Sequence, residues 1–167
     1  PLEVRKEPEK FTMLPSYARI RHRLVEERQR KLAAFAETFP GNRMEIHDPS
    51  VGIITAGIAY QYAKEVFPDY SYLKLGMVWP LPQGLIRRFF EEVKRVYVIE
   101  ELDPFLEDNI RAMGLRPRGG KNLVPITGEL NPLIVERSLL GKKFKAPKPF
   151  FDEPLPPRPP NLCPGCP

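Results

Sequence analysis

The spacing of hydrophobic residues changes in kind once along this chain. Between residues 15 and 37 apolar side chains recur at helical intervals, and Pro15 and Ser16 favour a helix start in front of them. The stripe consists of Tyr17, Ile20, Leu24, Leu32 and Phe35. The tripeptide Pro-Gly-Asn at 40–42 then breaks the pattern. This stretch therefore predicts one long helix.

From residue 51 onward, short apolar runs alternate with helical stripes. Runs rich in β-branched and aromatic residues predict strands at 51–57, 70–76, 95–101 and 122–127. Helical stripes follow these runs at 58–66, 82–93, 104–113 and 132–140. Pro125 has no backbone N–H, so the last strand is expected at an edge of the sheet. Asn131 and Pro132 favour the start of the final helix.

Alternation at this spacing predicts an α/β fold with a mostly parallel sheet and helices on both faces. The chain then divides into three segments. Residues 1–48 form an extension with the N-terminal helix, residues 49–143 form the α/β domain, and residues 144–167 form a Pro-rich C-terminal arm. Nine of the 21 prolines fall between 147 and 167, which favours a linker or a wrapping arm.

Composition and charge argue against several classes of protein. The hydrophobic content is 42%, which suits a globular protein with one core. There is no run of about 18 apolar residues and no signal segment, so we expect a cytoplasmic protein without membrane insertion. The net charge is +5, but the basic residues at 19–31 alternate with Glu26 and Glu27, which predicts ion pairs on a solvated helix face. No nucleic-acid partner is expected. Because Pro1 is not a start residue, we also expect the chain to be a piece of a longer protein.

Candidate ligand contacts lie where the strands end, because ligands of open α/β sheets gather at the carboxyl ends of strands. We single out Thr55, Gly57, Glu100 and Glu101 there. The turn at Gly57 lacks the glycine pattern of dinucleotide sites, so no nucleotide is expected. The acidic residues at 100–103 suit acid, base or ion-ligand chemistry. The favoured interpretation is structural: Asp103 caps a helix, and one glutamate either accepts hydrogen bonds from loop amides or pairs with a neighbouring arginine.

Three other residue types were candidates for chemistry. His22 and His47 have no serine, cysteine or second histidine at a useful spacing, so neither is expected to serve a metal or a triad. Trp79 is expected to be a packed anchor. The pair Cys163 and Cys166 has Cys-x-x-Cys spacing, but thiolate sites for zinc or clusters need four ligands. The pair is therefore half of a larger site, a disulfide or two ordinary thiols.

Four stretches carry a resemblance to a known family: "TAGIAYQY", "LKLGMVWPLP", "VIEELDPFLE" and the closing "LCPGCP". Over residues 51–114 and the tail, the chain resembles the central region of the alpha subunits of indolepyruvate:ferredoxin oxidoreductases. These are thiamine-diphosphate enzymes of the 2-oxoacid:ferredoxin oxidoreductase superfamily. The resemblance implies that residues 49–143 are a transketolase C-terminal-like domain, and that residues 144–167 lead into a thiamine-diphosphate-binding domain outside this chain.

The resemblance further implies the activity of a parent enzyme. That enzyme oxidatively decarboxylates indolepyruvate and other aryl pyruvates to aryl-acetyl-CoA, with ferredoxin as electron acceptor. Its cofactors are thiamine diphosphate, Mg²⁺ and 4Fe-4S clusters, coenzyme A is its co-substrate, and its beta subunit and flanking alpha-subunit domains are the partners of this region. Cys163 and Cys166 would then correspond to two cluster ligands. The chain alone is expected to bind none of the cofactors and to be inactive.

Two alternatives from other classes stay open. The chain could be a freestanding α/β module that binds a small, CoA-like molecule at its strand-end loops. It could instead be an interaction adaptor whose Pro-rich arm docks on a partner in an extended conformation.

Overall fold

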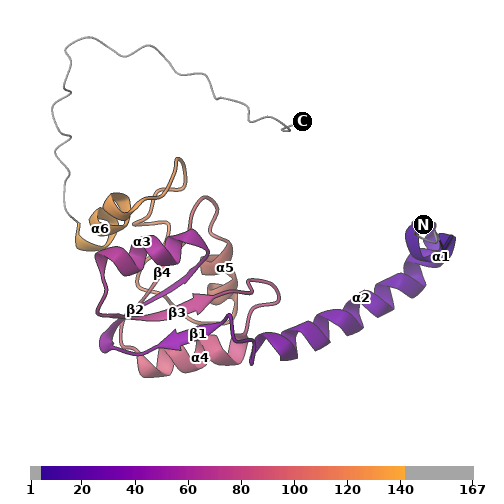
Figure 1. The fold of residues 1–167 in the computed structure, drawn as a ribbon, viewed down its shortest axis with the longest axis horizontal. Coiled ribbons are helices and arrows are strands. Elements are labelled where there is room, and N and C mark those ends of the chain that lie inside the picture. The colour runs from indigo at the N-terminus through magenta and orange to yellow at the C-terminus, as the bar shows by residue number, and fades with distance from the viewer. Residues whose placement is uncertain (1–4, 142–167) are drawn as a thin grey trace, which may run out of the picture.

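The computed structural model describes residues 5–141, so Cys163, Cys166 and the predicted arm at 144–167 lie outside the described part. The elements along the chain are α1 (Pro8–Phe11), α2 (Pro15–Ala36), β1 (Arg43–Glu45), β2 (Asp48–Ala56), α3 (Ile58–Val66), β3 (Tyr70–Leu75), α4 (Gln83–Glu92), β4 (Val96–Ile99), α5 (Phe105–Ala112) and α6 (Pro132–Leu140). Their order confirms the predicted α/β class (Figure 1).

The sheet has the strand order β1-β3-β2-β4. Strand β2 is parallel to both of its neighbours, whereas the short strand β1 is antiparallel to β3. The carboxyl ends of β2, β3 and β4 therefore lie together at the same end of the sheet. The hydrophobic pattern did not predict β1, because only Met44 in this strand packs against the core.

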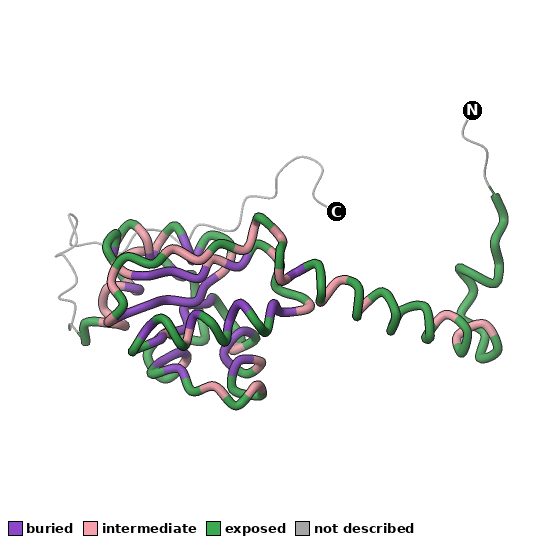
Figure 2. Tube along the Cα trace, turned by 90° about the horizontal axis from the view of Figure 1, so that it is seen from below, coloured by how far each residue is buried: buried purple, intermediate pink, exposed green. Residues whose placement is uncertain are grey.

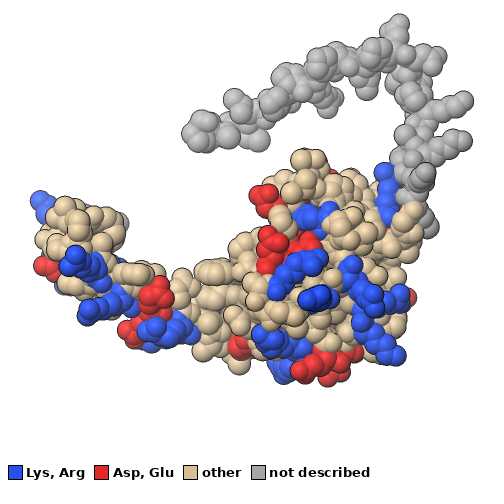
Figure 3. Space-filling model, turned by 180° about the vertical axis from the view of Figure 1, so that it is seen from behind, with Lys and Arg blue, Asp and Glu red and all other residues tan. Residues whose placement is uncertain are grey.

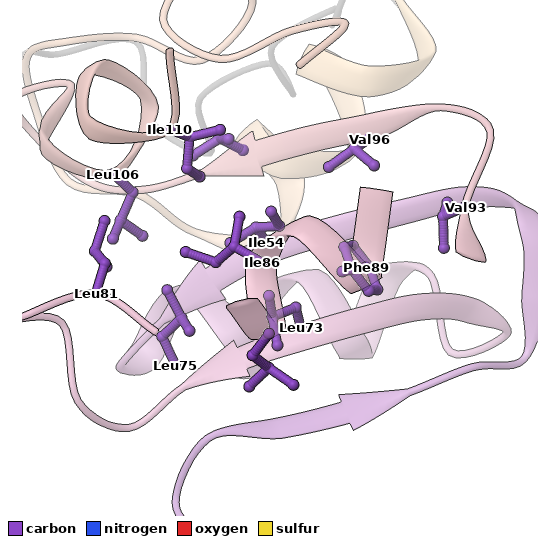
Figure 4. Packing of buried hydrophobic residues seen from close by; sticks show 12 residues of the cluster. Ile54, Leu73, Leu75, Leu81, Ile86, Phe89, Val93, Val96, Leu106 and Ile110 are labelled. Carbon is purple, nitrogen blue, oxygen red and sulfur yellow. The ribbon is translucent and has the colours of Figure 1, made fainter. Parts of the chain in front are cut away.

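Each face of the sheet carries its own hydrophobic cluster, because neighbouring strand residues point to opposite faces. Ile54 points into the cluster covered by α4 and α5, which Figure 4 shows from close by. Ile53 points into the cluster covered by α3 and α6. In that second cluster the Tyr72 hydroxyl lies 2.8 Å from the carbonyl oxygens of both Ala63 and Phe67. The prediction of helices on both faces is confirmed.

The fourth predicted strand, at 122–127, is wrong, because this stretch forms turns. The outer edge of β4 is already paired with the chain at residues 118 and 119. The Arg118 N–H donates to the Val96 carbonyl at 2.7 Å, and the Gly119 carbonyl accepts the Val98 N–H at 2.9 Å. The chain then turns at Gly120, whose carbonyl accepts two following N–H groups. Val124 is still buried, so the apolar run serves the core as a turn.

Helix α2 projects from the sheet region, and green exposed residues predominate along it in Figure 2. Its C-terminal end is attached: Ala36 is buried, and the Glu37 carboxylate accepts the N–H groups of Gly84 and Leu85 at the start of α4. Much of its predicted apolar stripe is exposed, including Ile20 at 64%. The predicted i,i+4 ion pairs are present, as between Glu27 and Lys31 at 2.6 Å. Figure 3 shows acidic and basic side chains next to each other on this helix.

Candidate functional site

Three loops from the carboxyl ends of the strands enclose an open groove of about 420 Å³. Its walls come from the β2–α3 turn, the β3–α4 loop and the β4–α5 loop, through Ala56, Gly57, Ile58, Ala59, Val78, Glu100, Glu101, Phe105 and Leu106. Two slightly larger hollows, of about 520 and 540 Å³, lie along the projecting helix among exposed charged side chains. We take the groove as the candidate site, because the loops that follow three parallel strands converge there.

The predicted candidates Gly57, Glu100 and Glu101 all line this groove. Gly57 has φ +57° and ψ −138°, a conformation that residues with a Cβ atom rarely adopt. It lets the chain turn sharply from β2 into α3. Thr55 does not line the groove: it is fully buried in the sheet, and its hydroxyl has no hydrogen-bond partner among the described residues. Whether any of the four contacts a ligand stays a prediction.

Glu100 acts as the cap of helix α5. Its carboxylate accepts the backbone N–H of Leu106 at 2.7 Å and that of Glu107 at 3.0 Å. Burial raises the pKa of this carboxyl group, against the effect of the two hydrogen bonds. The prediction that one glutamate accepts amide hydrogen bonds is confirmed. The prediction that Asp103 caps the helix is wrong, because the Glu100 carboxylate, directly after β4, already accepts the N–H groups at the start of α5.

A second layer of polar contacts fixes the loops around Glu100. Glu101 accepts the N–H of Leu130 at 2.7 Å, and the Lys121 ammonium donates to the carbonyl of Glu100. The buried Glu107 accepts two hydrogen bonds from Arg111 and the N–H of Lys121. Although burial acts in the opposite direction, these contacts lower the pKa of Glu107. The carboxylates are therefore used to hold loop backbone in place.

The rim of the groove is apolar and unusually exposed. Trp79 is 57% exposed, which makes the predicted role of packed anchor wrong, and its ring stands edge-to-face against Phe105 at 6.2 Å between centroids. Leu102 is also 57% exposed and has φ +57°, the left-handed conformation that costs a leucine about 1–2 kcal/mol. Ile58 and Val78 extend the same apolar rim.

Sequence reasoning missed the roles of Lys121, Glu107 and Leu102. Lys121 and Glu107 are distant in sequence and become neighbours only when the loop at 118–121 pairs with β4. The conformation of Leu102 has no signal in the sequence, since leucine does not favour positive φ. Among the missed groove residues, only Phe105 carries a signal in the sequence, because it is an aromatic residue directly after the helix-opening Pro104.

The histidines take no part in this site. His22 lies 3.2 Å from Glu26 on α2, and His47 lies 3.4 Å from the Lys64 ammonium. Within residues 5–141 there is no group of three His, Cys, Asp or Glu side chains placed to hold a metal ion. In the same range no helix combines the length and the apolar character needed to cross a membrane.

The fold has a counterpart among solved structures. A 2-oxoglutarate:ferredoxin oxidoreductase from Magnetococcus marinus, solved with 2-oxoglutarate, coenzyme A and succinyl-CoA bound, matches with a TM-score of 0.56 and 20% identity. The match covers 78% of this chain and 24% of that one. No protein-family model matches the chain. The chain therefore shares its fold with a section of that enzyme.

The particular relatives are indolepyruvate oxidoreductase subunits IorA. The chain is 36% identical to IorA of Archaeoglobus fulgidus and 35% identical to IorA of Thermococcus kodakarensis, over 99% and 98% of its length. IorA of Pyrococcus horikoshii is 33% identical. These comparisons confirm the resemblance seen in the sequence. The chain spans about 29% of the length of the curated relatives it matches.

Proposed function

We propose that this chain is the non-catalytic central domain of an indolepyruvate:ferredoxin oxidoreductase. The parent enzyme oxidatively decarboxylates indolepyruvate and other aryl pyruvates to aryl-acetyl-CoA and passes the electrons to ferredoxin. Residues 49–143 form the transketolase C-terminal-like domain, and residues 144–167 lead toward the thiamine-diphosphate-binding domain. The beta subunit and the flanking alpha-subunit domains are its partners, and the enzyme is cytoplasmic.

The observation that carries this proposal is the similarity to IorA along 98–99% of the chain. The chemistry of the groove supports a role in architecture and not in catalysis. Both oxygens of Glu100 already accept backbone N–H groups, and Glu101 holds the Leu130 N–H. A carboxylate that fixes a helix start is a poor proton carrier, because any proton transfer would release the amides it holds.

The carboxylates that line the groove are poorly suited to Mg²⁺, one of the parent's cofactors. Mg²⁺ needs free oxygen ligands, and the carboxylates of the groove are engaged with amides. In the parent, thiamine diphosphate supplies the carbanion chemistry and iron-sulfur clusters carry the electrons. Cys163 and Cys166, which lie outside the described residues, are proposed as two ligands of a 4Fe-4S site that other cysteines would complete.

The experiment that tests the proposal starts from the producing cells. The polypeptide that contains this sequence is purified, its intact mass is measured, and CoA-dependent reduction of ferredoxin by indolepyruvate is assayed. We expect a chain several times longer than 167 residues with this activity, and an inactive isolated 167-residue chain. A purified polypeptide of 167 residues that ends at Pro167, or a long chain without this activity, would overturn the assignment.

The groove favours one second candidate, a freestanding binder of a small, CoA-like molecule. Its volume of about 420 Å³ lies within the usual range of ligand sites. The phosphates of such a ligand would however face Glu100 and Glu101 without a basic side chain among the lining residues. Equilibrium dialysis of the isolated chain with coenzyme A distinguishes the two: saturable binding favours the binder, and its absence favours the architectural domain.

A further inference from the structure

We propose that one face of helix α2 docks on another part of the parent polypeptide, against a protein surface where apolar groups surround at least one carboxylate. This inference rests on the proposed function, because it takes the longer polypeptide as given. It adds to that function the surface that makes the contact and the chemistry of the surface that receives it.

Helix α2 has little packing of its own. It runs for 22 residues, and Ala36, at its C-terminal end, is the one residue of the helix that is buried. Figure 2 shows the helix leaving the sheet region with exposed residues along most of its length. Helices in proteins gain most of their stability from packing an apolar face against a neighbour. We therefore expect another surface to cover one face of α2 in the assembled protein.

One face of this helix is apolar at both ends and basic in the middle. Residues three, four or seven positions apart lie on the same face of an α-helix. The face consists, in order, of Tyr17, Ile20, Leu24, Arg28, Lys31 and Phe35. Ile20, Leu24 and Phe35 are 64%, 44% and 51% exposed. An open hollow of about 520 Å³, beside α1, lies next to Tyr17, Ile20 and Leu24 and can receive an apolar side chain of a partner.

The charge of the helix indicates an acidic partner. Between residues 15 and 36, six lysine and arginine residues stand against Glu26 and Glu27. Lys31 pairs with Glu27 at 2.6 Å, whereas Arg28 forms no ion pair with an Asp or Glu of residues 5–141. An arginine in the middle of a covered face needs a carboxylate, because an uncompensated buried charge is strongly unfavourable. The partner surface therefore carries a carboxylate between its apolar groups.

The same pattern disfavours two other occupants. Two copies of α2 that pack through this face place their Arg28 side chains directly against each other when parallel. When antiparallel, the two Arg28 residues lie within about 6 Å along the helix axis, because the centre of the face is near residue 26. A helix that lies on a lipid surface keeps its cations on the polar face and not within the apolar one. A protein surface with a carboxylate therefore fits this face better than a second copy or a membrane.

The remainder of the parent polypeptide is the source of that surface. The similarity to IorA of Archaeoglobus fulgidus extends over 99% of this chain, α2 included, but over 29% of that protein. Under the proposed function, most of the polypeptide is thus joined covalently to α2. A surface of the same polypeptide has a millimolar effective concentration, so the contact area of one helix face is sufficient.

The test measures amide hydrogen exchange of residues 15–36 in the purified full-length alpha polypeptide, by mass spectrometry of its peptic peptides. Arg28→Glu reverses the charge in the middle of the face, and Arg19→Glu, on the far side of the helix, is the matched control. Each change places a carboxylate one turn before a basic residue, Lys31 or Arg23, so neither weakens the helix by itself. Docking predicts that Arg28→Glu accelerates exchange of α2 by at least about tenfold and that Arg19→Glu leaves it unchanged.

A further variant, Leu24→Ser, tests the apolar part of the face. Leu24 is 44% exposed in this structure, so its loss costs little in an uncovered helix. Faster exchange of α2 in Leu24→Ser therefore supports the docking. Equal exchange in the unsubstituted polypeptide, Arg28→Glu and Arg19→Glu overturns it. Protection of α2 that appears only with the beta subunit, or that is lost on dilution, overturns it in favour of another subunit or a second copy.

The same preparations report on the proposed function separately, through their intact mass and their CoA-dependent reduction of ferredoxin by indolepyruvate. A long, active polypeptide in which α2 exchanges as fast as an isolated helical peptide refutes the docking and leaves the proposed function standing. A polypeptide of 167 residues refutes both, because it holds no other part on which α2 could dock.

Discussion

The carboxylate of Glu100 lies under the first turn of α5 and receives the N–H of Leu106 at 2.7 Å. This contact joins the end of β4 to the start of the following helix across the loop that contains Leu102 and Asp103. It therefore fixes the loop that forms one wall of the groove.

Replacing Glu100 by glutamine should lower the free energy of unfolding by about 1–2 kcal/mol, because one of two amide hydrogen bonds at the helix start is lost. The sequence pattern favoured Asp103 as the cap, so Asp103→Asn is the matched control and should have little effect. Urea denaturation of both variants decides between them. A larger loss in Asp103→Asn than in Glu100→Gln would refute the assignment of the cap.

The same variant has a pH signature. Burial raises the pKa of Glu100 above its ordinary value of 4.5, so the folded chain binds a proton more strongly than the unfolded chain. The stability of the unsubstituted chain, relative to the stability of Glu100→Gln, should therefore fall as the pH rises from about 4.5 through the raised pKa. Denaturation curves of both proteins across this range measure the difference, and a difference independent of pH would contradict it.

Glu107 should show the opposite dependence. Burial disfavours its charged form, but hydrogen bonds from the Lys121 N–H and from Arg111 prevail and lower its pKa below 4.5. Its contribution is therefore present above pH 4.5 and is lost as the pH falls through the lowered value. Glu107→Gln should cost about 1–3 kcal/mol at neutral pH and less in acid. Asp108→Asn, the exposed neighbour on the same helix, is the control.

Two glycines of strand β2 and its turn should be intolerant of alanine for different reasons. A Cβ at Gly52 would lie 2.6 Å from the Phe89 ring, so Gly52→Ala overpacks the core, at about 1–3 kcal/mol. A Cβ at Gly57 would meet nothing within 4 Å, but its backbone has φ +57°. Gly57→Ala should therefore cost about 1–3 kcal/mol through conformation alone, because its ψ of −138° places it in a region that is sparsely populated by residues with a Cβ atom.

The companion change Phe89→Leu separates the two effects. It replaces the ring that a Cβ at Gly52 would touch by a smaller side chain. The double variant Gly52→Ala/Phe89→Leu should therefore be more stable than the sum of the two single losses of unfolding free energy predicts. Phe89→Leu should not alter the cost of Gly57→Ala. Additive free energies for both pairs would show that space at Gly52 is not the limiting factor.

Much of the fold could be predicted because the sequence repeats its periods clearly. The buried runs around Ile53, Tyr72 and Val98 are strands in the structure, and each helical stripe after them is a helix. The wrong prediction of a strand at 122–127 has a tertiary cause. The run around Val124 is as apolar as a strand, but the pairing position beside β4 is already filled by Gly119. Such competition for one sheet edge is a tertiary effect that no local pattern contains.

The candidate site could be predicted only as a location. Parallel strands bring their carboxyl ends together, so the meeting of Gly57, Glu100 and Glu101 followed from the topology. The direction of each side chain did not. Thr55 is fully buried inside the sheet and does not reach the groove. The exposure of Trp79 depends on how the loop at 77–82 leaves the sheet. These features are set by loop packing, which the pattern of hydrophobic residues does not encode.

Glu37 connects the projecting helix to the rest of the fold, and its removal should loosen that connection. Its two oxygens accept the N–H groups of Gly84 at 2.8 Å and Leu85 at 2.9 Å, so a residue at the end of α2 caps α4. Glu37→Ala should cost about 1 kcal/mol and should accelerate hydrogen exchange at these two amides in particular. Residue-resolved exchange by NMR measures this, with Glu27→Ala on the exposed face of α2 as the control that leaves both amides unchanged. Unchanged protection at Gly84 and Leu85 in Glu37→Ala would mean that α4 starts without help from α2, and that the orientation of α2 rests on other contacts, such as the burial of Ala36 and the hydrogen bond from the Asn42 side chain to the Ala36 carbonyl.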